Sequence, residues 1–203
     1  MIKLGIFIIP NQQLKKVILK FKKIVQNQFG NQTYLKHLPH CTLYVFETSK
    51  KNLQEIKKIR HLKYKTNKLF FTKNTNIFLN DPITKKNTYT IDINKNSFLT
   101  NLQIQVLKKF GKYSRKRKIK FPSKRMQNNY RLYGYPFIKL NWRPHFTIAS
   151  ISLKNNQSDF IKKFRNYRVS YKQSLNNIYV YRIRGNKHNL INKIKIWLID
   201  LFA

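Results

Sequence analysis

Apolar and polar positions along the chain alternate between two periods, that of a strand and that of a helix. Strand-type runs are expected at residues 1–9, 40–46, 64–71, 76–79, 88–93, 145–151, 167–171, 178–184 and 194–201. Helical spacing is found at 14–29, 49–60, 97–110 and 158–164, with a helix end expected near Gly30 and caps at Ser49, Ser97 and Ser158. The order strand, helix, strand, helix, strands is followed by helix, loop, strand, helix, strands. This pattern predicts an α+β fold that resembles an internal duplication.

One short motif occurs at corresponding places in the two halves. Pro39 to Leu43 and Pro144 to Ile148 both read Pro-His-x-Thr-apolar, and each opens an apolar strand-type run. Alternate residues of a strand share a face. We therefore expect His40 to project beside Thr42, and His145 beside Thr147. The residues between them, including Cys41, should point into the core.

A histidine beside a hydroxyl, presented twice, suits phosphate-ester chemistry without a metal. One imidazole can take a proton while the other gives one, because the ordinary pKa of histidine is about 6.5. The hydroxyls can donate hydrogen bonds to phosphate oxygens as negative charge develops on them. For in-line attack on phosphorus, one imidazole must lie on each side. We assign His145 as the base and His40 as the acid.

The paired motifs resemble those of the 2H phosphoesterase superfamily, which includes bacterial 2′–5′ RNA ligases and RNA 2′,3′-cyclic phosphodiesterases. This resemblance implies that His40, Thr42, His145 and Thr147 form the catalytic set. It also implies a two-lobed pseudo-twofold fold, with antiparallel sheets lining a central cleft and helices outside. Residues 1–203 are then a single domain with intermixed lobes. An irregular basic loop at about 111–141 would be a lid, a guide for substrate, or a solvated loop.

The function implied is metal-independent hydrolysis of 2′,3′-cyclic phosphate or 2′–5′ phosphodiester bonds in RNA or nucleotides. Run in reverse, the same site would make a 2′–5′ bond. Two alternatives stay open. One is a catalytically silent, basic RNA-binding protein of the same fold, and the other is a phosphodiesterase for a small cyclic nucleotide. The expected partner is RNA or a nucleotide with a cyclic phosphate.

The formal net charge of +37 is extreme. It would attract RNA through phosphate contacts, or it reflects a composition rich in Lys, Asn, Ile, Phe and Tyr. No apolar run is long enough to span a bilayer, so no membrane association is expected. A single cysteine excludes an internal disulfide and favours the cytoplasm. We expect a monomer.

A resident metal or cofactor is not expected. Only six acidic residues occur in the chain, and no pair of carboxylates lies near the motifs. Tyr34 and Tyr135 precede the motif strands and could stack on a base, and Arg143 could reach a phosphate; packing or solvated roles are the alternative for all three. The remaining histidines lack a threonine two residues later and are expected to be surface or satisfied polar residues: His37, His61 and His188. His37 lies close to the first motif and could also line the cleft.

Overall fold

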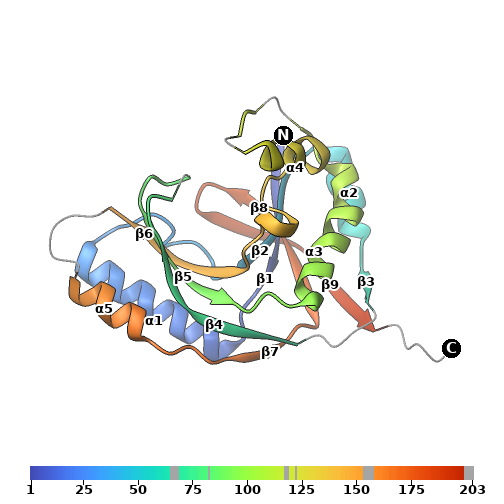
Figure 1. Cartoon of the computed structure of the whole chain (residues 1–203). Helices are drawn as coiled ribbons and strands as arrows, with labels where there is room; N and C mark the ends of the chain where they lie inside the picture. The colour runs from blue at the N-terminus through green and yellow to red at the C-terminus, as the bar shows by residue number, and fades with distance from the viewer. Residues whose placement is uncertain (65–68, 82, 117–118, 122, 153–157, 199–203) are drawn as a thin grey trace.

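The computed structural model describes residues 1–64, 69–81, 83–116, 119–121, 123–152 and 158–198 (Figure 1). Its strands are β1 (Ile2–Ile8), β2 (Cys41–Thr48), β3 (His61–Tyr64), β4 (Leu69–Phe78), β5 (Asn87–Ile93), β6 (His145–Ile151), β7 (Lys172–Ser174), β8 (Asn177–Arg184) and β9 (Lys187–Leu198). Its α-helices are α1 (Gln12–Phe29), α2 (Lys50–Lys58), α3 (Ser97–Phe110), α4 (Lys124–Tyr133) and α5 (Ser158–Asn166). Short 3₁₀ helices follow α3 at Gly111–Tyr113 and α4 at Lys139–Asn141.

The strands form two sheets, as the predicted two-lobed α+β fold requires. The first sheet has the order β2-β1-β8-β9-β3 and the second has the order β6-β5-β4-β7. Described strand pairs are antiparallel except for β3 and β9, which run parallel. Each motif strand is therefore an edge strand, β2 in the first sheet and β6 in the second.

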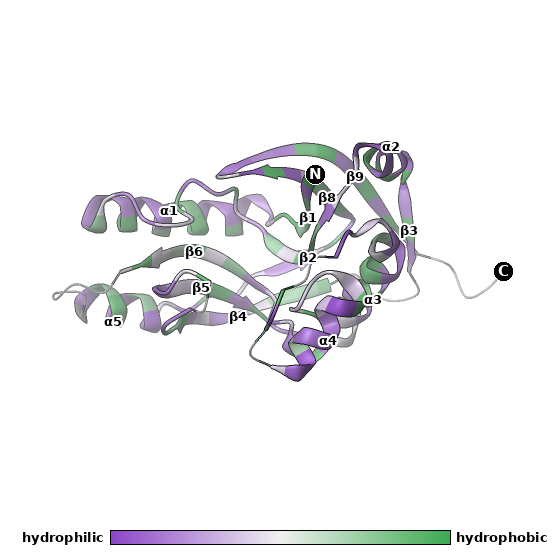
Figure 2. Cartoon of the chain, turned by 90° about the horizontal axis from the view of Figure 1, so that it is seen from above, coloured by the Kyte–Doolittle hydropathy of each residue, from purple (hydrophilic) through white to green (hydrophobic). Residues whose placement is uncertain are grey.

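Helices α1, α2, α3 and α5 lie beside the two sheets (Figures 1 and 2). Helices α1 and α5 pack together through Phe21 against Phe164 and Phe29 against Phe160, and Tyr89 of β5 contacts both phenylalanines of α5. The views of Figures 1 and 2 place α1 and α5 beside the second sheet, and α2 and α3 beside the first. Figure 2 shows hydrophobic and hydrophilic positions interleaved along these helices, as expected when one helix face is buried.

The helix ends follow local chemistry that is partly visible in the sequence. Helix α1 ends as predicted at Gly30, where φ is +67°. Ser49 caps α2 by accepting a hydrogen bond from the backbone N–H of Asn52. The predicted cap at Ser97 is wrong, since Asn96 accepts from the N–H of Leu99 and Ser97 is the first helical residue.

The irregular segment predicted at 111–141 instead contains α4. Ser123 caps this helix, and Gly134 ends it at φ +72°. The runs predicted at 64–71 and 76–79 are replaced by β3 and one longer strand, β4, and the run at 167–171 by β7. Residues 65–68 and 199–201 of the predicted strands, and residues 117–118 and 122 of the predicted loop, lie outside the described residues. In the described part of the chain, no helix combines the length and apolar character needed to cross a bilayer.

Candidate functional site

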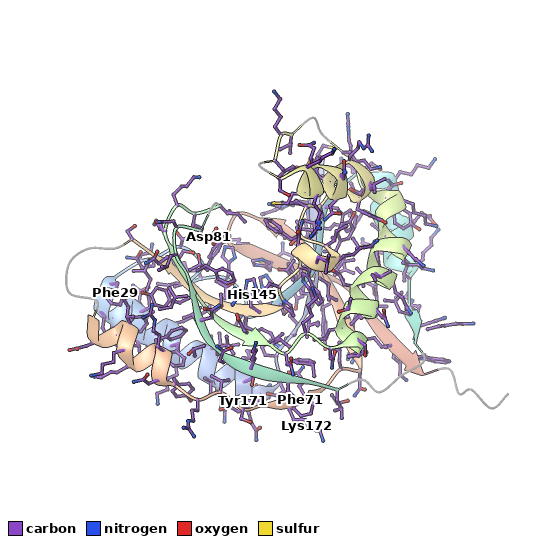
Figure 3. The ribbon with its side chains drawn as sticks, viewed as in Figure 1. Phe29, Phe71, Asp81, His145, Tyr171 and Lys172 are labelled. Carbon is purple, nitrogen blue, oxygen red and sulfur yellow. The ribbon has the colours of Figure 1, made fainter. Side chains whose placement is uncertain are left out.

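The two motif strands begin next to each other, although they belong to different sheets. The indole Nε1 of Trp142 donates a 2.8 Å hydrogen bond to the backbone carbonyl of Thr42. Burial raises the pKa of the Cys41 thiol to about 12, and a hydrogen bond from the His145 backbone partly opposes that shift. Figure 3 labels His145 near the middle of the molecule, on the strand that approaches β2. The structure thus brings both motifs into one region.

Both motif histidines are held in the same way. Nδ1 of His40 lies 2.6 Å from the carbonyl oxygen of Leu38, and Nδ1 of His145 lies 2.8 Å from that of Arg143. Since a carbonyl only accepts, each Nδ1 must carry the hydrogen. Nε2 is then the position at which each imidazole exchanges a proton. A backbone contact two residues upstream therefore fixes the tautomer of both rings.

His40 lies in apolar surroundings. The ring of Phe7 stacks on it with centroids 3.9 Å apart. Burial is the main cause that lowers the pKa of His40 to about 3, and nearby positive charge acts in the same direction. The hydrogen bond to Leu38 acts in the opposite direction. His40 is therefore neutral at physiological pH. A Cβ on Gly5 would lie 2.1 Å from the Phe7 ring, so only glycine leaves room for that ring.

Two more histidines, His37 and His188, lie beside His40, and the sequence had indicated closeness to the first motif only for His37. The ring of His188 is 5.3 Å from that of His40 and 4.9 Å from that of His37. Nε2 of His37 is 2.8 Å from Oδ1 of Asn186 in the β8–β9 turn. Burial lowers the pKa of both His37 and His188. Both side chains are half-buried, because pairing of β1 with β8 brings this turn to the first motif.

His145 has a carboxylate beside it. Asp92 is its partner in the β5–β6 register and is 8% exposed. Arg143 donates to Asp92 Oδ2 from Nε at 3.2 Å and from Nη2 at 2.5 Å. Burial lowers the pKa of His145; the Arg143 carbonyl and Asp92 raise it, and the Arg143 guanidinium lowers it.

Polar side chains on and beside β5 hold the Asp92 carboxylate by hydrogen bonds. Asn76 and Thr90 both donate hydrogen bonds to the Asp92 carboxylate, at 3.2 and 2.9 Å. The sequence indicated this face, because Thr88, Thr90 and Asp92 alternate with apolar residues. It did not indicate that Asp92 would lie opposite His145, since that depends on the pairing register.

The motif threonines are half-buried and available for a ligand. Within the described part of the chain, neither Thr42 nor Thr147 uses its hydroxyl in a hydrogen bond to protein. Thr147 pairs with Thr90 in the β5–β6 register, and Thr42 pairs with Phe7. The described residues contain no group of three or more His, Cys, Asp or Glu that could hold a metal ion.

The three predicted substrate contacts are placed differently. The Tyr34 ring packs edge-on against His37 with centroids 5.0 Å apart, close to the first motif. Tyr135 packs against Tyr44, and burial raises the pKa of its hydroxyl. The guanidinium of Arg143 is exposed, but it is engaged by Asp92 and lies 4.2 Å from the Phe78 ring centroid. Their roles in binding stay predictions.

Comparison with known proteins gives a likeness in structure alone. No protein-family model matches the sequence, and no curated protein matches it. The crystal structure of TT0787 of Thermus thermophilus is similar over 95% of this chain and 97% of its own, with 13% identity and a TM-score of 0.63. E. coli LigT in its apo form is similar over 96% of this chain and 97% of its own, with 11% identity and a TM-score of 0.51. The chain therefore has the fold of LigT and TT0787, which confirms the predicted two-lobed α+β fold.

Proposed function

We propose that the protein is a metal-independent phosphodiesterase that hydrolyses 2′,3′-cyclic phosphate or 2′–5′ phosphodiester bonds in RNA or nucleotides. One observation carries the proposal. Each motif presents an imidazole fixed through Nδ1, with Nε2 left for proton transfer, beside a threonine hydroxyl without a partner among the described residues. The likeness to LigT supports a nucleotide-type ligand, since one structure of that protein is a complex with NADP+ (TM-score 0.50).

The surroundings of the two histidines support roles opposite to those chosen from the sequence. His40 is held neutral by burial beneath Phe7, which suits a base. Burial lowers the pKa of His145 as well, but Asp92 beside it opposes that shift and so favours the protonated form that an acid needs. Nε2 of His40 would take a proton from water as the water oxygen bonds to phosphorus. The bond from phosphorus to a ribose oxygen would break, and His145 would protonate that oxygen.

Thr42 and Thr147 would donate hydrogen bonds to the non-bridging phosphate oxygens. Such donors act mainly on the transition state, where negative charge on these oxygens is greatest. Removing one comparable donor in other enzymes costs about 10²–10³ in kcat. We therefore expect Thr42→Ala and Thr147→Ala each to lower kcat by that order, and His40→Ala and His145→Ala to lower it further.

The test is turnover in the presence of a chelator. The substrates are 2′,3′-cyclic mononucleotides and oligonucleotides that end in a cyclic phosphate, and the product is identified by which ribose oxygen keeps the phosphate. For the cyclic mononucleotides, His61→Ala is the matched control, because that histidine is exposed and lies on β3, at the other edge of the first sheet. Activity that EDTA abolishes and a divalent ion restores would contradict the proposal.

A second candidate is an RNA-binding protein without catalysis, which the net charge of +37 favours. It predicts binding that weakens steeply with salt and is unchanged in His40→Ala and His145→Ala. Binding without turnover of any of these substrates would select it. Turnover of the mononucleotides alone would instead select a small cyclic-nucleotide phosphodiesterase.

A further inference from the structure

A second feature of the surface lies away from the motif strands. A hollow of about 430 Å³ is lined by His61, Leu62 and Lys63 of β3 and by Gln105, Lys108 and Lys109 of α3. None of these residues is acidic, and all three lysines are exposed. Strand β3 is the edge of the first sheet opposite to β2. The hollow is therefore separate from the proposed active site.

An aromatic pair adjoins this hollow. The rings of His61 and Trp197 stack with centroids 5.4 Å apart and an angle of 26° between their planes. Nζ of Lys195 lies 5.5 Å from the Trp197 ring centroid. Trp197 is 51% exposed, whereas the chain's other tryptophan, Trp142, is 3% exposed. A half-exposed indole of this kind leaves a flat apolar surface open to a ligand.

The parallel pairing of β3 and β9 explains how flat rings and ammonium groups come to share one surface. His61 is in register with Lys195, and Lys63 is in register with Trp197. Alternate residues of a strand share a face, so these four side chains lie on one side of the sheet edge. Leu62 and Ile196, which alternate with them, are buried.

We propose that this surface, formed by His61, Lys63, Lys108, Lys109 and Trp197, is a second binding site for single-stranded nucleic acid. A base would stack on the Trp197–His61 pair, and phosphates would contact the lysines of the hollow. Sites of this kind combine aromatic platforms with positive charge, and they tolerate most sequences because every base has a flat face. The site would hold RNA at a distance from any bond that the two motif histidines cleave.

Intrinsic fluorescence gives a direct assay. Because Trp142 is buried, quenching of tryptophan emission by a single-stranded oligouridylate would report on Trp197. We expect Trp197→Ala to weaken binding, measured by anisotropy of a labelled oligouridylate, by about 5- to 150-fold, the loss typical of one stacked base. Trp197→Phe should retain most of the affinity. Lys108→Gln with Lys109→Gln should reduce the slope of log K against log salt by about 1.4.

Two control variants separate a site from general positive charge. Lys162→Gln with Lys163→Gln removes the same charge from another hollow, on α5. Leu140→Ala removes a different exposed apolar side chain, 77% exposed. Both should bind like the wild type. Thermal melts would check that every variant folds.

Three outcomes would overturn the proposal. The first is that Trp197→Ala binds the oligouridylate with wild-type affinity. The second is that the α5 lysine variant loses as much affinity as the Lys108 and Lys109 variant. The third is that Trp197 is quenched by self-association or by anionic lipid vesicles instead of RNA. Binding is measured without turnover. Failure of the proposed catalytic function would therefore leave this test unaffected.

Discussion

Replacing Asp92 by Asn should move the descending limb of the pH profile of kcat/KM to lower pH. In the proposed mechanism, His145 must be protonated, so activity is lost as the pH rises through its pKa. Burial already lowers that pKa below 6.5, and Asp92 opposes the shift. Without the carboxylate, the pKa of His145 should fall further. In the wild type, the maximum should lie below pH 6.5 and above the pKa of His40, about 3.

The size of the shift follows from the geometry. Asp92 and His145 are cross-strand partners, whose Cβ atoms are typically about 5 Å apart. Unit charges about 6 Å apart interact by about 0.7 to 3 kcal/mol at effective dielectric constants of about 80 to 20. This corresponds to a pKa change of about 0.5 to 2. We expect the lower half of that range, since Arg143 is free to move away once its carboxylate partner is lost.

Arg143→Gln provides the opposing variant. Its guanidinium lowers the pKa of His145, so removing it should move the same limb to higher pH by a similar amount. The double variant should lie close to the wild type. Asp81, the other charge acting on His145, raises its pKa and is unchanged in all three proteins.

The assay measures initial rates on a 2′,3′-cyclic nucleotide from about pH 2 to 9, so that it covers the pKa of His40, at constant ionic strength and with chelator present. The ascending limb belongs to His40 and should stay in place. If Asp92→Asn moves the ascending limb and leaves the descending one, the two histidines have the opposite roles. If neither limb moves, the reasoning about His145 is wrong.

Three further predictions concern the surroundings of His40 and the first motif. Gly5→Ala forces the Phe7 ring away from His40, so it should destabilise the protein by about 1–3 kcal/mol in denaturant melts and lower kcat. His188→Ala exposes His40 and removes a charge that lowers its pKa, so the ascending limb of kcat/KM should move to higher pH. Lys22→Met removes the donor to three partly buried backbone carbonyls and should cost about 1–3 kcal/mol of unfolding free energy.

Each of these three predictions has an outcome that would contradict it. Gly111→Ala is the control for Gly5, because its Cβ would meet its nearest atom at 3.7 Å and should be harmless. Equal melting of the two alanine variants would refute the argument on Phe7. An ascending limb that stays in place in His188→Ala would show that this imidazole does not act on His40. If Lys22→Met is as stable as the wild type, water must donate to the three carbonyls in place of the ammonium group.

Local sequence patterns predicted what depends on neighbours in the chain. The strand period placed Cys41 in the core, where it is fully buried. Gly30 and Ser49 marked helix ends because their backbone and side-chain chemistry acts within one turn. Helix α4 was missed because it has a weak apolar face, with Tyr130 as its one buried residue. Such a segment depends on its caps and tertiary contacts more than on periodicity.

Features that depend on contacts between distant segments could not be predicted in this way. His188 reaches His40 because β8 pairs with β1, and Asp92 reaches His145 through the β5–β6 register. A shift of one residue in either register would turn these side chains to the other face. The stacking of His61 on Trp197 likewise requires β3 to pair in parallel with β9. A single sequence contains no local signal that specifies how distant strands pair.

The exchange of elements between the two halves limits how the molecule can move. Helix α1 precedes the first motif strand, yet it packs against α5 of the second half, and β1 pairs with β8 from near the end of the chain. One continuous hydrophobic core joins both sheets. A hinge between the halves would have to break that core. The distance between the two imidazoles is thus fixed by the packing of this shared core, and we expect it to stay the same when a substrate binds.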